Sequence, residues 1–179
     1  MLGRKQNVKN GKQNTNNIFK KNVMLEWNNT IKVLNEFGKI LVERYRENLQ
    51  EHRASGKLQD TCRYFIETGT NSIELNLSLE EYWKYIEYGT KPHWPPITAI
   101  RNWIEIKPVL PYPGKDGKLP TPEQLAFLIS RKISIEGTKP TNILEGTIDE
   151  VLAEFDNALD EAITQDLDTE LSAIMTIIH

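Results

Sequence analysis

The 179-residue sequence contains only one cysteine, Cys62, and three histidines. A single cysteine cannot form an internal disulfide or a cysteine-based zinc cluster within one chain. We expect Cys62 to be a small apolar strand residue, because free cysteines are usually buried. The H-E-x-x-H, G-x-x-x-x-G-K-[ST] and G-x-S-x-G motifs are also missing, so no common zinc-protease, P-loop or hydrolase site is indicated.

Long apolar runs are absent as well. No stretch approaches the roughly 18 consecutive apolar residues of a membrane span, and no apolar segment follows the first basic residues. We therefore expect no signal peptide and no membrane partner. The protein is expected to act in a cytoplasm or on a particle that is assembled there.

Charge is distributed unevenly along the chain. The net charge of -3 argues against a protein that coats nucleic acid with its whole surface. Residues 1–21 nevertheless carry six bases and no acid: Arg4, Lys5, Lys9, Lys12, Lys20 and Lys21. Residues 143–179 carry ten acids and no Lys or Arg, and the acids include Asp149, Glu150, Asp156 and Asp160.

Residues 1–22 are predicted to be a flexible basic arm, because Asn, Gln and Lys cannot bury enough apolar area to offset chain entropy. Such an arm needs a partner to become ordered. The acidic face of an adjacent copy and DNA are both complementary to it. Salt would weaken either contact, so both alternatives stay open.

Apolar periodicity predicts helices over 23–52, 82–88, 96–104, 121–136 and 144–174, and strands over 61–67 and 73–79. The last helix should bury one face, formed by Leu144, Ile148, Val151, Phe155, Ala158, Ala162, Leu167, Leu171 and Ile174. The two strands should form a hairpin. This pattern predicts an α+β fold, a small antiparallel sheet packed against a long N-terminal helix and a long C-terminal helix. We expect one domain over 23–165 and a helical extension over 166–179.

Local signals predict where the shorter helices begin and end. Ser78 and Glu81 have the spacing of a capping box, and Thr121 and Gln124 have it again around Pro122. Pro96 is suited to the first position of its helix. The proline-rich segment 107–120 is predicted to be an exposed irregular loop.

Three groups of residues could carry chemistry, and each also has a purely structural interpretation. His93 lies in a proline-rich turn, where packing is favoured over a role as ligand or general base. Asp156, Asp160 and Glu161 share a helix face, which favours a solvated surface over a metal site. The aromatic cluster Tyr82, Trp83, Tyr85, Tyr88, Trp94 and Trp103 could stack bases, but core packing is favoured. We therefore predict no catalytic residue, no metal and no cofactor.

The strongest local signal is a repeated turn, Gly-Thr-Lys-Pro, which occurs at 89–92 and again at 137–140. Each copy follows a predicted helix, where glycine supplies a positive φ and proline makes the chain leave extended. The two copies can be understood as independent helix stops. The predicted turn residues are Gly89, Thr90, Pro92, Pro95, Pro96, Gly137, Thr138 and Pro140.

The segments 85–92, 95–104 and 125–140, in this order and spacing, resemble tail-completion or neck proteins of tailed bacteriophages. The resemblance covers roughly residues 25–165. It implies a non-enzymatic virion protein of the head–tail junction or tail that forms a ring with copies of itself. The implied partners are other virion proteins (portal, neck, tail tube or tail terminator), with possible non-specific contact to packaged DNA.

Together with the charge pattern, the resemblance gives a candidate interface of the six arm bases, Trp94 and the acids Asp149, Glu150, Asp156 and Asp160. The implied location is the tail or neck of the virion, reached through the host cytoplasm during assembly. The alternative is a phage nucleic-acid-binding accessory protein that uses the basic N-terminal arm.

Overall fold

The computed structural model describes residues 26–52, 55–69, 72–107, 109–114 and 117–178. The predicted basic arm, with its six lysine and arginine residues, lies outside the described residues. The elements in chain order are α2 (Asn28–Asn48), η1 (Gln50–His52), α3 (Lys57–Thr61), β1 (Arg63–Thr68), β2 (Ile73–Ser78), α4 (Trp83–Glu87), α5 (Ile97–Ile106), α6 (Pro122–Glu136) and α7 (Ile143–Ile178).

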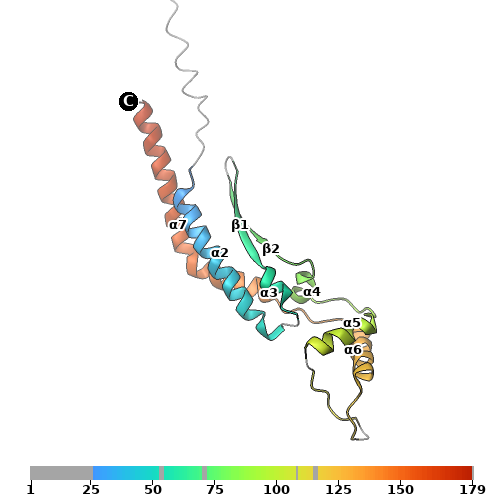
Figure 1. Cartoon of the computed structure of the whole chain (residues 1–179). Coiled ribbons are helices and arrows are strands. Elements are labelled where there is room, and N and C mark those ends of the chain that lie inside the picture. Colours follow the sequence, from blue (N-terminus) through green and yellow to red (C-terminus); the bar gives the residue numbers. More distant parts are fainter. Residues whose placement is uncertain (1–25, 53–54, 70–71, 108, 115–116, 179) are drawn as a thin grey trace, which may run out of the picture.

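The predicted α+β fold is confirmed: the two long helices α2 and α7 lie side by side and a two-stranded antiparallel sheet packs beside them (Figure 1). The pair is antiparallel, because Thr30 near the start of α2 contacts Asp166 far along α7. Near the other end, Asn48 donates a hydrogen bond to Thr147 Oγ1 over 3.0 Å. Between these contacts the rings of Phe37 and Phe155 meet edge to face at 5.7 Å.

The predicted hairpin is confirmed. β1 and β2 pair in a register that runs from Arg63 opposite Ser78 to Thr68 opposite Ile73. The sheet approaches α2 where the ring of Tyr64 lies over Gly38, and the Tyr64 hydroxyl donates to the carbonyl of Asn35 over 3.1 Å. A glycine in the middle of a helix costs stability, but here it lets the strand pack close to the helix.

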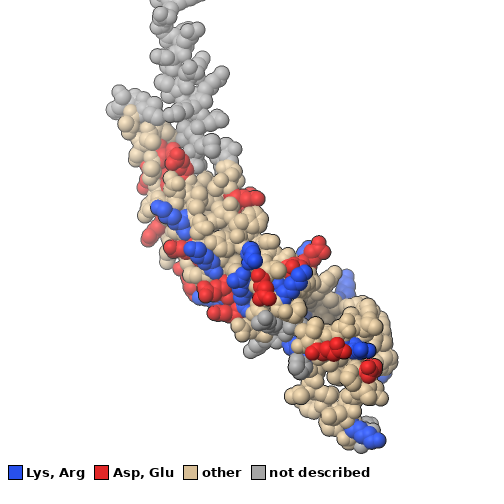
Figure 2. All heavy atoms as spheres, in the orientation of Figure 1, with Lys and Arg blue, Asp and Glu red and all other residues tan. Residues whose placement is uncertain are grey.

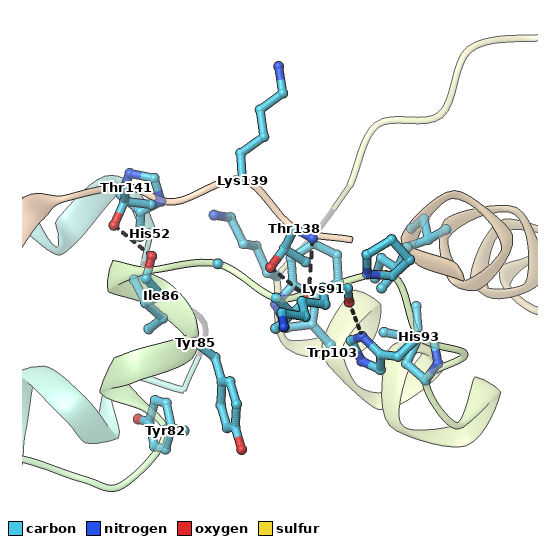
Figure 3. A pocket seen from close by; sticks show the side chains of 18 residues that line it. His52, Tyr82, Tyr85, Ile86, Lys91, His93, Trp103, Thr138, Lys139 and Thr141 are labelled. Carbon is cyan, nitrogen blue, oxygen red and sulfur yellow. Dashed lines mark hydrogen bonds between the residues drawn. The ribbon is translucent and has the colours of Figure 1, made fainter. Parts of the chain in front are cut away.

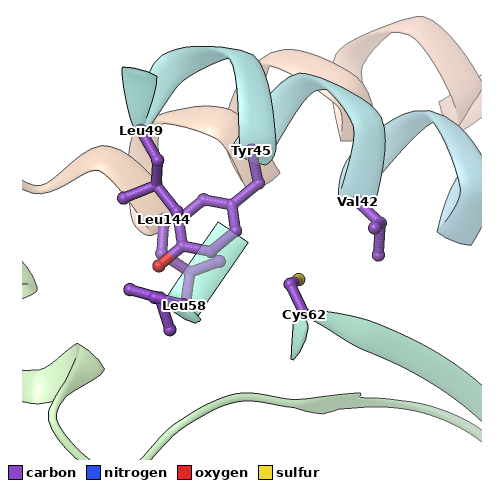
Figure 4. Packing of buried hydrophobic residues seen from close by; sticks show 6 residues of the cluster. All are labelled: Val42, Tyr45, Leu49, Leu58, Cys62 and Leu144. Atoms are coloured by element: carbon purple, nitrogen blue, oxygen red, sulfur yellow. The ribbon is translucent and has the colours of Figure 1, made fainter. Parts of the chain in front are cut away.

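A group of buried side chains connects α2, α3 and the start of α7. Its members are Val42, Tyr45, Leu49, Leu58, Cys62 and Leu144 (Figure 4). The predicted burial of Cys62 is confirmed, although it ends α3 one residue before the strand begins. Burial raises the pKa of its thiol, which leaves it in the unreactive protonated form at neutral pH.

Three local predictions were wrong. Thr61 does not start the strand, because residues 57–61 form the short helix α3. Ser78 is the last residue of β2, and no side chain caps α4, whose N-cap residue is Tyr82. Pro96 precedes α5 as its N-cap residue rather than occupying its first position. The first error omits the short helix α3, and the other two displace a helix start by a few residues.

Helices α5 and α6 pack against each other and form a small lobe at the end of the molecule that lies away from the C-terminus (Figure 1). The capping box of α6 is confirmed, since Thr121 Oγ1 accepts from the N–H of Gln124 and the Gln124 side chain accepts from the N–H of Thr121. The apolar side expected for α5, formed by Ile97, Ile100, Trp103 and Ile104, is not buried. No residue of α5 is buried in the single chain.

Two buried carboxylates cap helices that are remote in sequence. Glu87, at the end of α4, accepts the N–H groups of Leu144 and Glu145 over 2.8 and 2.9 Å and so caps α7. Asp166, in α7, accepts the N–H groups of Asn29 and Thr30 over 3.0 and 2.8 Å and so caps α2. Each anion faces the positive end of a helix, where its charge is favourable.

The face predicted for the last helix is confirmed only in part, since Leu144 is buried but Ala158 is exposed. Val151 and Ala162 are buried, whereas Leu167 and Leu171 are exposed. Asp166 occupies the buried position at that level instead. The reason is that α2 begins at this level, with Asn28. The first N–H groups of α2 need a hydrogen-bond acceptor, and the periodicity of α7 had predicted only apolar side chains here.

Candidate functional site

The two Gly-Thr-Lys-Pro turns lie against each other. Thr90 and Thr138 form an isolated antiparallel bridge, in which each N–H donates to the other residue's carbonyl over 3.1 Å. Their hydroxyls are 3.0 Å apart as well. The first turn carries the chain from α4 into the α5–α6 lobe, and the second carries it back to α7, so the bridge ties the two connections together.

Glycine is required at both turns for two reasons. The φ angles of Gly89 and Gly137 are +67° and +72°, which confirms the predicted positive φ. A Cβ on Gly89 would overlap the carbonyl oxygen of Thr138, and a Cβ on Gly137 would overlap that of Thr90. The repeated sequence therefore forms one reciprocal joint, and the interpretation of two independent helix stops is wrong.

A groove with a volume of about 940 Å³ opens beside this joint (Figure 3). Its walls come from α4, from both turns and from the facing sides of α5 and α6. The lining is largely apolar and aromatic and includes Tyr82, Tyr85, Ile86, Ile100, Trp103, Ile129 and Ile133. Tyr85 is 65% exposed and Trp103 37% exposed, so the groove presents aromatic surface to its surroundings.

The charged groups of the groove are all potentially cationic. Its lining contains Lys91, Lys107, Lys139, His52 and His93, and it contains no Asp or Glu. His93 Nδ1 lies 2.9 Å from the carbonyl oxygen of Lys91, so this ring nitrogen is occupied by a backbone contact. Lys139 projects away from the aromatic side chains at the outer edge of the groove (Figure 3).

The predicted aromatic core is wrong for four of its six members. Tyr82 and Trp83 pack against the buried cluster around Tyr45, but Tyr85, Tyr88, Trp94 and Trp103 are exposed. Trp94 lies outside the groove lining and meets Phe127 of α6 at a ring separation of 5.8 Å. Tyr85 and Trp103 therefore line the groove and Trp94 covers α6, whereas Tyr88 contacts the ring of Trp83 at a centroid separation of 5.8 Å.

The acidic members of the predicted interface all lie on α7. Asp149, Glu150, Asp156 and Asp160 are exposed there, and the six basic members of the arm lie outside the described residues. Nearby, Arg44 of α2 pairs with Glu154 at 2.6 Å, and this hydrogen bond lowers the pKa of the Glu154 carboxyl. The helical spacing separates the acids along the axis of α7.

Within the described ranges, no group of three or more His, Cys, Asp or Glu side chains is placed to hold a metal ion. The two buried carboxylates, Glu87 and Asp166, are occupied by helix caps. The groove therefore offers apolar and aromatic surface together with cationic side chains.

Comparisons of this chain with protein families, with curated proteins and with solved structures give no match. The resemblance to tail-completion and neck proteins thus stays a prediction. Among the described residues, no helix has both the length and the apolar character needed to cross a membrane.

Sequence reasoning identified the two turns but missed their pairing and the groove that they border. The sequence signal that could have indicated the pairing is the exact repeat of Gly-Thr-Lys-Pro, because it gives both turns a similar backbone geometry. Residues 89–92 and 137–140 are 48 positions apart, and no local pattern indicates that they touch. The burial of Glu87 had no such signal, because its carboxylate accepts hydrogen bonds from backbone N–H groups of the distant helix α7.

Proposed function

We propose that this chain is a structural protein of a tailed-bacteriophage virion and forms a ring through subunit contacts at the head–tail junction, neck or tail end. The observation that carries the proposal is the exposed apolar surface of the α5–α6 lobe. Ile97, Trp103 and Ile106 of α5 and Phe127 and Leu128 of α6 all remain exposed in the single chain.

Monomeric proteins rarely expose large contiguous apolar patches, and such patches mark contacts with other proteins. The connection between α5 and α6 extends the exposed surface with Leu110, Tyr112 and Leu119. In Figure 2 this end of the molecule is mostly uncharged, whereas acids and bases alternate over the α2–α7 body. A lobe that exposes several large apolar side chains and buries few residues of its own helices is suited to burial between subunits.

The elongated outline of the described chain supports the same proposal. The lobe and the end of α7 lie at opposite ends (Figure 1), so one copy can contact neighbours through two different surfaces. Contacts between unlike surfaces generate closed rings when the rotation between copies closes. Portal, neck, tail-tube and terminator proteins are the proposed neighbours, with packaged DNA as a non-specific contact of the basic arm.

Native mass spectrometry of the purified full-length chain tests the proposal. We expect a closed oligomer with a single number of subunits, because a fixed rotation between neighbouring copies closes the ring at one subunit number. A chain that stays monomeric at every concentration would contradict the ring. The same preparation should bind DNA weakly and with strong salt dependence through the arm alone.

A further inference from the structure

We propose that the groove beside the paired turns binds the C-terminal end of α7 from a second copy of this chain. The copies then join head to tail. This inference rests on the proposed function and names the two surfaces of its subunit contact. It starts from an apolar groove and an apolar helix end that lie at opposite ends of one molecule (Figure 1).

The end of α7 has the side chains that a groove of this kind accommodates. Leu167, Leu171 and Met175 recur every four residues along one side of the helix and are 39%, 59% and 62% exposed. Positions i, i+4 and i+8 lie on one helix face. An amphipathic helix that lays such a face into an apolar groove is a recurrent mode of recognition between proteins.

Charge complementarity selects this occupant. The groove lining holds three lysines and two histidines and no acid, whereas residues 167–179, the end of α7 beyond Asp166, hold the two acids Asp168 and Glu170 and no lysine or arginine. Lys91 and Lys139 are exposed, and neither takes part in the ion pairs found in the described part of the chain. Asp168 flanks the apolar face of α7 and is exposed.

The end of α7 cannot occupy the groove of its own chain. α7 is anchored by Asp166, whose carboxylate holds the start of α2, and Glu170 accepts the N–H of Glu26 over 3.4 Å. The helix therefore directs its last turns away from the lobe (Figure 1). A neighbouring copy has no such restriction. The contact joins unlike surfaces, which is the kind of interface that a closed ring needs.

Two single substitutions test the two surfaces of this contact separately. Tyr85→Glu places a charge in the groove, and Leu171→Glu places one on the helix end. Both side chains are more than half exposed, so folding should tolerate the changes. Phe65→Glu on β1 and Leu152→Glu on α7 are matched controls, because they add the same charge at exposed apolar positions elsewhere.

Sedimentation velocity on the full-length chain gives the decisive comparison. Each of the two test variants alone should associate at least about tenfold more weakly than the unchanged chain, and the controls should not. An equimolar mixture of the test variants should form 1:1 dimers, because one variant retains an intact groove and the other an intact helix end. Thermal melting would confirm that both variants fold.

A charge exchange provides a second, independent test on exposed residues. Lys91→Glu with Lys139→Glu should weaken association, and mixing this variant with Asp168→Lys should restore it in part. The inference is overturned if the unchanged chain associates and either test variant associates as well as it does, or if the mixture forms no 1:1 dimer. An unchanged chain that remains monomeric would overturn the ring proposal itself.

Discussion

Thr90 and Thr138 exchange both of their backbone hydrogen bonds, each over 3.1 Å, although they are 48 positions apart in the sequence. This bridge lies where the chain enters the α5–α6 lobe and where it returns to α7. The lobe is therefore joined to the body by two connections that are hydrogen-bonded to each other. The orientation of the groove depends on that joint.

The glycines of the joint should tolerate no side chain. Gly89→Ala and Gly137→Ala should each lower the free energy of unfolding by about 2 kcal/mol or more, because positive φ and overlap with a carbonyl both act against a Cβ. Gly117→Ala is the matched control. Gly117 has φ +74° but no atom near its added Cβ, so only about 1 kcal/mol should be lost. Urea unfolding measures the stability of all three variants. Equal losses of stability in the three would contradict the overlap between the added Cβ and the carbonyl oxygen.

Two helical glycines should respond in opposite directions to alanine. Gly38→Ala should destabilise the fold even though alanine favours helix, because its Cβ would lie 2.7 Å from Cε2 of the Tyr64 ring. Gly146→Ala in α7 meets no atom within 4 Å and should stabilise by about 0.5–1 kcal/mol. Thermal unfolding of the two variants checks the signs. A stabilising Gly38→Ala would show that α2 and the sheet are less closely packed than described.

Asp166 should make stability depend on acid pH. Burial of the carboxylate raises its pKa, but hydrogen bonds from Thr30 and Asn29 outweigh that effect and hold the pKa below its ordinary value. The stabilising contribution is complete above the unfolded-state pKa of about 3.9 and is lost as pH falls through the lower folded-state value. Asp166→Asn should therefore cost about 1–3 kcal/mol at pH 7 and progressively less below pH of about 4. Asp160→Asn, at an exposed position on the same helix, is the control for the unfolding curves.

Removal of the Glu87 carboxylate should loosen the start of α7. Glu87→Ala leaves the buried N–H of Leu144 and the adjacent N–H of Glu145 without their acceptor, which should cost about 2–4 kcal/mol. Hydrogen exchange at these two amides should accelerate more than at amides near Val151. Glu81→Ala, at an exposed residue just before α4, should change neither quantity. Unchanged protection of Leu144 in the Glu87 variant would refute the cap.

The sequence predicted those parts of the fold that depend on local periodicity or on local caps. The alternation of Ile73 to Leu79 predicted the hairpin strand, and Thr121 with Gln124 predicted the start of α6. α3 was missed because five residues are too few to display a helical period. The burial of Asp166 was missed because a charged residue in an acidic helix resembles its solvated neighbours until its partners in α2 are known.

The candidate site was predictable only in part. The repeated turns identified Gly89 and Gly137 correctly, since a helix stop with positive φ is a local property. The groove depends on how α4, α5 and α6 are arranged, which no single segment encodes. The aromatic residues were expected inside because large apolar side chains are usually buried, but Tyr85 and Trp103 line an open surface.

The most direct test of the proposed function is cryo-electron microscopy of phage particles that contain this chain. The account predicts a ring of identical subunits at the neck or tail, with the α2–α7 body and the lobe of Figure 1 resolved in each subunit. Particles whose neck and tail contain no density for this chain would contradict it.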